Sequence, residues 1–247
     1  MLSEVIKRRR ASSIAEVVDI MTALERELSR NDGLWWFNHL YLRVTLAVRS
    51  AVTTATFHDP AFLERLDVVF ANQYFDAVAA GDANPRAAPA AWRPVFECRH
   101  RRDILSIQFA LAGMNAHINR DLPAGIVATY LATDGAPVQS GTRYEDFNTV
   151  NELLEAVEAE IKSEFSAGIV AVVDAVGGEA DDAVAMWKVR AAREAAWTNA
   201  EVLWALRKAP ALRDAFFARL DGFTGFAGRG LLLPAVPPAI ERISGGT

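Results

Sequence analysis

The chain has few residues of the kinds that metal and cofactor sites most often use. It holds one cysteine, Cys98, and four histidines among 247 residues. Neither an intrachain disulfide nor a multi-cysteine metal site can therefore form. The sequence also lacks a glycine-rich phosphate loop, a GxSxG nucleophile elbow and an HExxH motif. Nothing in it favours a nucleotide-dependent reaction, and we expect no cofactor.

Excess positive charge and long apolar runs are missing as well. The net charge of −5 and the pI near 5.5 argue against nucleic acid as a partner, because phosphate binding needs a concentrated basic surface. The longest apolar run, residues 167–173, is too short to span a bilayer. The N-terminal basic stretch leads into no continuous apolar region of the signal-peptide kind. We expect a cytoplasmic protein with no membrane insertion, and a mobile basic end over residues 1–11.

Apolar residues recur every three to four positions along most of the chain, which is typical of amphipathic helices. Asp59 and Pro60 fit the N-cap and the first position of a helix. Glycines from Gly222 onward indicate an irregular tail. With no recurring strand pattern, the sequence predicts one all-α domain over residues 1–247 with about eight helices. These helices are expected near residues 14–28, 34–56, 60–80, 103–121, 122–133, 146–176, 181–207 and 210–221.

Residues 103–121 fit a central helix whose polar residues are expected to be buried. At roughly 100° per residue, they form two stripes on nearly opposite sides, with apolar residues between them. The stripes consist of Gln108, Asn115 and Asn119 on one side and Ser106, His117 and Asp121 on the other. Buried amides, imidazoles and carboxylates cost several kcal/mol unless they are paired. Other side chains, a metal or a ligand must therefore satisfy them.

His117 and Asp121 stand four residues apart, so their side chains can meet on one face of a helix. Three interpretations compete. The pair can bind a divalent metal. It can act in acid–base catalysis, with Asp121 orienting the imidazole of His117. It can also be structural, with Asp121 accepting a hydrogen bond and capping the next helix.

Further polar and aromatic residues are candidates for a substrate-binding pocket. They are Asn115, Asn119, Asn38, His39, Trp36, Tyr74, Arg190 and Trp197. The amides would bind a substrate carbonyl or hydroxyl, and the aromatic rings would enclose an apolar body. Arg190 and Trp197 belong to a row of Trp, Arg and Glu residues at helical spacing over residues 187–204. That row fits either a salt-bridged surface seam or the wall of a cleft.

Three segments resemble an uncharacterised bacterial family that carries only a domain-of-unknown-function label and occurs mostly in actinomycete-type genomes. They are residues 34–42 (LWWFNHLYL), 59–72 (DPAFLERLDVVFAN) and 114–123 (MNAHINRDLP). The resemblance covers most of the chain and implies no established activity. It does imply that the NAHINRDLP segment is a family hallmark, which favours a site at Asn115, His117, Asn119 and Asp121.

The leading hypothesis is a small-molecule enzyme with a pocket inside a helical domain, acting on a small apolar or amphipathic molecule. His117 would be the acid–base group and Asp121 would orient it. Such a site suits a cofactor-independent cyclisation, isomerisation or hydrolysis in specialised metabolism. Two alternatives stay open: a metal-dependent helical hydrolase, and a non-catalytic binding or assembly protein. A homo-oligomer is compatible with each of them.

Overall fold

The computed structural model of the chain describes residues 2–6, 10–53, 57–155 and 189–234. Within these ranges every regular element is a helix, which confirms the predicted all-α fold. The α-helices are α1 (Leu2–Ile6), α2 (Ile14–Glu27), α3 (Gly33–Thr53), α4 (Pro60–Gly81), α5 (Arg93–Cys98), α6 (Ser106–Ala116), α7 (Leu122–Leu131), α10 (Val189–Ala205) and α11 (Pro210–Leu231). A further helix covers residues 142–155. Short helical turns of other types are η1 (Pro85–Ala87), η2 (His117–Asp121) and η3 (Leu206–Lys208).

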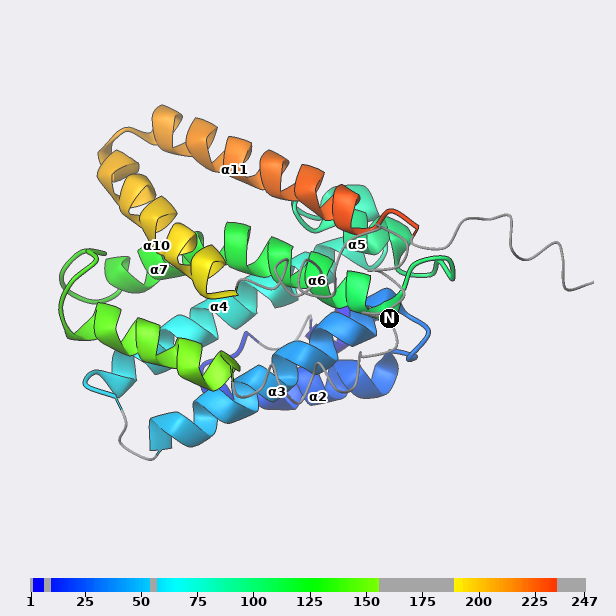
Figure 1. Cartoon of the computed structure of the whole chain (residues 1–247), viewed down its shortest axis with the longest axis horizontal. Coiled ribbons are helices and arrows are strands. Elements are labelled where there is room, and N and C mark those ends of the chain that lie inside the picture. Colours follow the sequence, from blue (N-terminus) through cyan, green and yellow to red (C-terminus); the bar gives the residue numbers. More distant parts are fainter. Residues whose placement is uncertain (1, 7–9, 54–56, 156–188, 235–247) are drawn as a thin grey trace, which may run out of the picture.

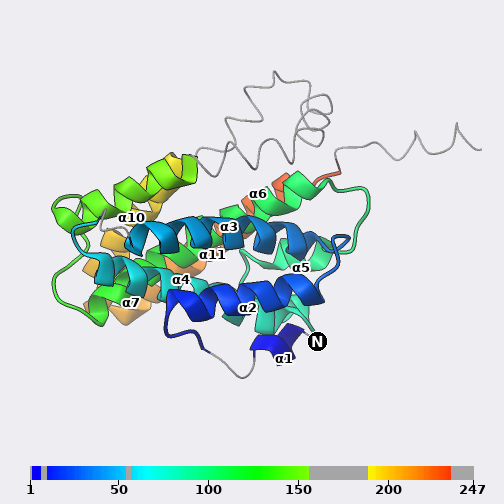
Figure 2. The same cartoon turned by 90° about the horizontal axis from the view of Figure 1, so that it is seen from below.

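The helices surround a middle group formed by α4, α6 and α7. In Figure 1, α11 runs along the upper edge, α10 slants from the middle to the upper left, and α2 and α3 run along the lower edge. Helix α6 contacts α3 on one side and α11 on the other, while α7 contacts α4 and α10. Figure 2, seen from below, places the helix over residues 142–155 on the side of α3 that faces away from α2. This arrangement encloses η2, the connection between α6 and α7, where the hallmark segment lies.

Close helix contacts set the position of α3 against α6. A Cβ atom added at Gly113 in α6 would lie 2.4 Å from the ring of Phe37 in α3. Phe37 is almost fully buried and packs edge-on against Tyr74 and Trp92. Gly113 therefore allows the two helices to approach, and this approach holds the Phe37 ring in the centre of the protein.

Helix α4 begins where the sequence predicts. The side chain of Asp59 accepts a hydrogen bond from the backbone N–H of Phe62 at 3.0 Å, and Pro60 opens the first turn. This N-cap supplies a partner for a backbone donor that the helix itself cannot satisfy. Arg143 also binds Asp59, with Nε 2.8 Å from Oδ2, so the start of α4 is tied to the helix over residues 142–155.

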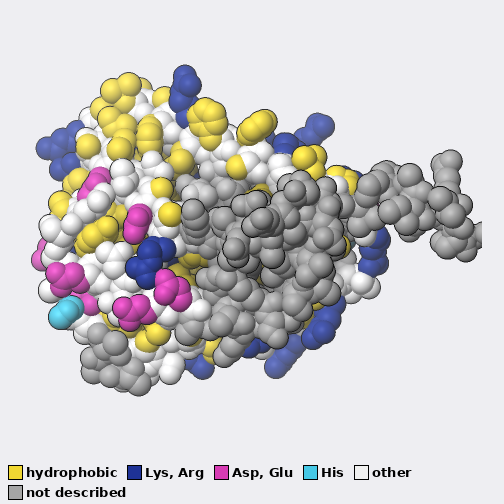
Figure 3. Space-filling model, viewed as in Figure 1, with side chains coloured by type: hydrophobic (Ala, Val, Ile, Leu, Met, Phe, Trp, Pro, Cys, Tyr) yellow, Lys and Arg dark blue, Asp and Glu magenta, His cyan; other side chains and the backbone are white. Residues whose placement is uncertain are grey.

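The glycines near the C-terminal end do not end a helix, contrary to the predicted irregular tail. Helix α11 continues through them to Leu231. A Cβ atom at Gly225 would lie 2.3 Å from the backbone oxygen of Ala90, so this glycine permits close packing. The outer side of α11 exposes Phe223 and Phe226, and Figure 3 shows hydrophobic side chains along this upper edge.

The first residues form a short helix. Leu2 and Ile6 of α1 are buried, and α1 contacts α4. The basic residues 7–9 and the predicted helical segments 156–176 and 181–188 lie outside the described residues. In the part of the chain that is described, none of the helices combines the length and apolar character needed to cross a membrane.

Candidate functional site

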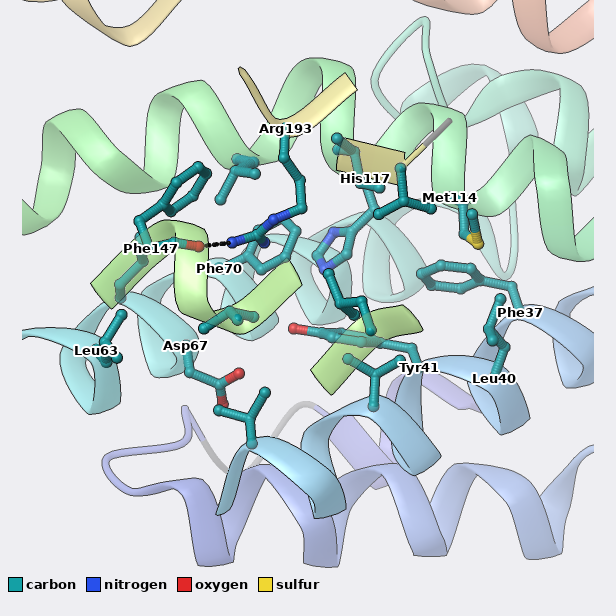
Figure 4. Close-up of a pocket in the computed structure, with 18 residues that line it drawn as sticks. Phe37, Leu40, Tyr41, Leu63, Asp67, Phe70, Met114, His117, Phe147 and Arg193 are labelled. Carbon is teal, nitrogen blue, oxygen red and sulfur yellow. Dashed lines mark hydrogen bonds between the residues drawn. The ribbon is translucent and has the colours of Figure 1, made fainter. Parts of the chain in front are cut away.

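A cavity lies between α3, α4, η2, α10 and the helix over residues 142–155. The space open to the centres of water molecules is about 110 Å³, several times the 10–15 Å³ that one water needs by the same measure. Its described lining is apolar apart from four polar side chains, drawn in Figure 4. The lining residues are Phe37, Leu40, Tyr41, Val44, Val48, Leu63, Leu66, Asp67, Phe70, Met114, His117, Ile118, Leu122, Phe147, Val150, Leu154, Val189 and Arg193.

The hallmark segment enters this cavity through a π-turn. The sequence predicts that a helix ends at residues 121–123, but the chain stays helical from α6 through η2 into α7. The backbone N–H of Leu122 donates to the carbonyl of His117, five residues earlier, as a π-turn requires. Pro123 cannot donate a backbone hydrogen bond, and the wider turn carries the helix past it. The π-turn holds His117 and Asp121 together and buries both side chains.

The carboxylate of Asp121 is fully buried and surrounded by donors. Its Oδ2 accepts from Nε1–H of Trp92 at 2.9 Å and lies 3.0 Å from Nδ1 of His117. Its Oδ1 accepts from Nη1 of Arg120 at 2.7 Å. Arg120 in turn lies 3.4 Å from Asp221 of α11. The negative charge is therefore compensated in place, by donors from two segments: Trp92, and His117 with Arg120 of η2.

The imidazole of His117 has one satisfied nitrogen and one free nitrogen. Because an ionised carboxylate only accepts, Nδ1 carries the hydrogen and donates to Asp121. Nε2 is buried and has no hydrogen-bond partner within the described residues. The ring stacks on Phe70, with centroids 3.5 Å apart. Burial lowers the pKa of His117, and the hydrogen bond to Asp121 opposes that shift only in part, so the ring is neutral at pH 7 with a lone pair on Nε2.

Two more polar groups line the cavity: Tyr41 from α3, whose ring packs edge-on against the His117 ring with centroids 4.5 Å apart, and Asp67 from α4. The Tyr41 hydroxyl and Oδ2 of Asp67 are buried without a hydrogen-bond partner in the described ranges. Burial, strengthened by the charge of nearby Glu64, raises the pKa of Asp67 to about 7. Burial and the charge of Asp67 raise the pKa of Tyr41 well above its usual range. Near neutral pH the Asp67 carboxyl can therefore donate a proton, and the Tyr41 hydroxyl can donate a hydrogen bond.

Arg193 of α10 is the cation of the cavity. It is 8% exposed, and its Nε donates to Oδ1 of Asn151 while Nη2 donates to the carbonyl of Phe147, both at 2.8 Å. The guanidinium also lies over the Phe147 ring, 4.1 Å from its centroid. All three contacts are to neutral groups. Burial lowers the pKa of Arg193 to about 9, so the side chain stays charged at neutral pH.

Asn115 and Asn119 lie together, as predicted, but beside the main cavity. Nδ2 of Asn119 donates to Oδ1 of Asn115 at 3.1 Å, and Nδ2 of Asn115 donates to the carbonyl of Thr224. Both amides line a second cavity that shares Met114, Ile118 and Val189 with the first. The two cavities are therefore adjacent, because these three side chains line both of them.

The predicted residues of α3 and α4 are occupied by structural contacts. The fully buried amide of Asn38 donates to the carbonyl of Met21 and accepts from the Tyr74 hydroxyl at 3.2 Å. His39 binds Glu25 through Nδ1 and stacks on Trp35, while Nε1–H of Trp36 donates to the carbonyl of Arg30. None of Asn38, His39, Trp36 and Tyr74 lines the cavity.

The predicted row on α10 divides between two environments. Arg190 is exposed and pairs with Glu155, with Nη2 2.6 Å from Oε1. Trp197 is fully buried against Tyr130, Tyr144 and Phe147, outside the cavity lining. The row therefore forms neither one surface seam nor one cleft wall, and Trp187 lies outside the described residues. The predicted enclosure by Trp36, Tyr74 and Trp197 is replaced by Phe37, Tyr41, Phe70 and Phe147.

The hypothesis of a metal centre at His117 needs additional ligands. Across residues 2–6, 10–53, 57–155 and 189–234, no three His, Cys, Asp or Glu side chains come together in a way that could hold a metal ion. The nitrogen of His117 that faces Asp121 is engaged in a hydrogen bond.

Sequence reasoning missed Tyr41, Asp67 and Arg193 as site residues. Asp67 carried a usable signal, because it is a single carboxylate within the apolar stretch of residues 66–70. Arg193 lies less than one helical turn from the predicted Arg190, so helical spacing alone could not separate the exposed arginine from the buried one. Tyr41 is one of several aromatic residues of α3, and only the packing of α3 distinguishes it.

Comparison with known proteins confirms the resemblance to a family of unknown function. Neither a search of curated proteins nor a search of solved structures found a match. A family model, described as a family of unknown function (DUF5995), matches residues 14–234. That match covers α2 to α11 and includes every polar residue of the cavity. The chain therefore belongs to the family of unknown function DUF5995.

Proposed function

We propose that this protein is an enzyme that transfers protons on a small, mainly apolar carbonyl compound bound in the cavity. The observation that carries the proposal is the His117–Asp121 pair. The imidazole belongs to a residue that lines the apolar cavity, its Nδ1–H is held by a compensated carboxylate, and its neutral Nε2 has no hydrogen-bond partner within the described residues. This arrangement is the one that general-base catalysis requires.

Asp67 supplies the complementary acid in this proposal. Its pKa of about 7 leaves a substantial fraction protonated near neutral pH, while His117 is unprotonated there. Two groups whose environments shift their pKa values in opposite directions form an acid–base pair. The Tyr41 hydroxyl is a further neutral donor to a substrate oxygen.

The proposed step removes a proton from the carbon next to a substrate carbonyl. Nε2 of His117 takes the proton, the C–H electron pair forms the enol double bond, and the carbonyl oxygen receives a proton from Asp67. When the substrate carries a β,γ double bond, His117 returns the proton to the γ carbon, the double bond moves to the α,β position, and the enol O–H proton goes back to Asp67, which completes an isomerisation. When the substrate carries a second carbonyl, the enol carbon attacks that carbonyl carbon, its oxygen takes the proton from His117, and the enol O–H proton goes back to Asp67, which completes a cyclisation instead. In ester hydrolysis, Nε2 of His117 takes a proton from water as the water oxygen attacks the carbonyl carbon, and the departing alcohol oxygen then takes that proton as its bond to the carbonyl carbon breaks. None of these reactions consumes a cofactor.

The proposal is tested by deuterium exchange into apolar ketones, such as 2-decanone and 4-phenyl-2-butanone, incubated with the protein in D₂O. We expect exchange at the carbon next to the carbonyl above the buffer rate, and loss of this acceleration in His117→Gln. The matched control is His39→Gln, because His39 pairs with Glu25 outside the cavity. No acceleration by the wild-type protein, or equal acceleration by His117→Gln, would contradict the proposal.

A further inference from the structure

The cavity contains a buried positive charge that no carboxylate in the described residues neutralises. Arg193 is 8% exposed, and its hydrogen bonds reach one side-chain amide and one backbone carbonyl. No ion pair of Arg193 is formed within the described ranges. Asp67 is the only acidic residue in the described lining, and no salt bridge joins it to Arg193.

A second buried arginine in the same protein has the carboxylate partners that a buried cation usually has. Arg99 is also 8% exposed, but its guanidinium binds Asp32 on one side and Asp82 on the other. Taking a cation out of water is expensive, and a partner carboxylate is the ordinary compensation. The contrast between Arg99 and Arg193 indicates that the carboxylate for Arg193 comes from outside the described chain.

The guanidinium keeps donors available for such a partner. Two of its five N–H groups are used by Asn151 and Phe147, which leaves three. A planar guanidinium matches a carboxylate through two parallel hydrogen bonds, and such bonds are stronger than those between neutral groups. Because the described lining offers a single cation among apolar side chains, it fits one negative charge on an otherwise apolar molecule.

We infer that the substrate is an amphipathic carboxylic acid, and that Arg193 binds its carboxylate while the apolar lining receives its hydrocarbon body. This inference rests on the proposed function, since it names the substrate class of the same cavity. His117 and Arg193 line the same cavity (Figure 4). A carboxylate bound to Arg193 would therefore fix the orientation of the substrate relative to the base.

The test compares binding of decanoate with binding of decan-1-ol, and of 4-phenylbutanoate with 4-phenylbutan-1-ol, by isothermal titration calorimetry. We expect each carboxylate to bind the wild-type protein at least about tenfold more tightly than its alcohol, the effect of one charge-assisted contact. Arg193→Met should remove this preference. Arg193→Lys, which keeps the charge, should retain part of it. Arg190→Gln is the matched control, because Arg190 pairs with Glu155 outside the cavity, and it should keep the preference unchanged.

The outcomes separate this inference from the proposed function. Equal binding of acid and alcohol by the wild-type protein, or an undiminished preference in Arg193→Met, overturns the inference and leaves the base at His117 untouched. Preference for the acid in His117→Gln supports it, because ion pairing does not need the imidazole. Binding of none of the four probes overturns the inference together with the idea of an apolar ligand cavity. Should Arg193→Met fail to fold, the ratio of acid to alcohol affinity in the wild-type protein and in Arg193→Lys still tests the inference.

Discussion

Nδ1 of His117 lies 3.0 Å from Oδ2 of Asp121, and both side chains are buried in the π-turn between α6 and α7. Trp92 and Arg120 donate to the same carboxylate. This relationship fixes the ring orientation and the tautomer of His117. The free Nε2 is then a consequence of how the hallmark segment folds.

Replacing Asp121 with asparagine should remove most of the proposed activity while the fold persists. An amide in this position can present an N–H to His117, which favours the wrong tautomer and protonates Nε2. We expect deuterium exchange into 2-decanone to fall by about 10²-fold to 10⁴-fold, the usual contribution of a positioned base. Asp76→Asn, at an exposed carboxylate bound to Arg10, is the control. Unchanged exchange in Asp121→Asn would remove Asp121 from the account.

Replacing Asp67 with asparagine should change how stability depends on pH. The carboxyl stays protonated up to about pH 7 in the native protein, whereas it ionises near pH 3.8 when unfolded. Between these values the native state binds more protons, so its stability falls as pH rises. Relative to wild type, Asp67→Asn should gain stability from pH 4 to pH 8, with an upper limit of about 4 kcal/mol.

The measurement is urea unfolding of both proteins at pH 4, 6 and 8. A difference in free energy of unfolding that grows with pH supports a protonated, buried Asp67. A difference that is constant across this range would show that the carboxyl is ionised throughout, and the acid of the proposed mechanism would be lost.

Removal of the two buried arginines should cost very different amounts of stability. Arg99→Met leaves Asp32 and Asp82 without their cation, and breaking a buried ion pair in this way costs about 3–5 kcal/mol. Arg193→Met removes a cation that has only neutral partners, and we expect a cost below about 1 kcal/mol in the absence of ligand. Urea unfolding of the two variants checks the order, and a larger loss for Arg193→Met would contradict it.

Gly113→Ala should loosen both the core and the cavity. The added methyl group would lie 2.4 Å from the Phe37 ring, so α3 or the ring must move, at a cost of about 1–3 kcal/mol. Because Phe37 lines the cavity, affinity for decanoate should fall as well. Gly222→Ala is the control, since a Cβ there meets no atom within 4 Å and alanine favours helix by up to about 1 kcal/mol. Equal stability of the two variants would contradict the packing argument.

Local signals predicted much of the fold. The spacing of apolar residues gave the helical class, and Asp59 with Pro60 marked the start of α4 correctly. The errors have a common physical cause: glycine and proline were interpreted as local helix breakers. In α11, Gly225 allows contact with the backbone of Ala90, and at η2 a π-turn accommodates Pro123. The first effect depends on a distant segment, and the second on a change of helical hydrogen bonding, neither of which the spacing of apolar residues reveals.

The candidate site was predictable only where it is local in sequence. His117 and Asp121 meet because they are four residues apart. Tyr41, Asp67 and Arg193 come from three other helices, and only tertiary packing brings them to one cavity. Asn38 and Tyr74 have the same residue chemistry as site residues, yet each satisfies the other in the core. Residue type and helical angle cannot distinguish a paired polar group from an open one.

The protonation state of His117 tests the central claim most directly. Nitrogen NMR of the protein labelled with ¹⁵N in its histidine rings resolves Nδ1 from Nε2, and His117→Gln assigns the signal. The account predicts a neutral ring at pH 7, with the hydrogen on Nδ1 and an unprotonated Nε2, and a pKa below the usual 6.5. A hydrogen on Nε2, or a doubly protonated ring at pH 7, would contradict it.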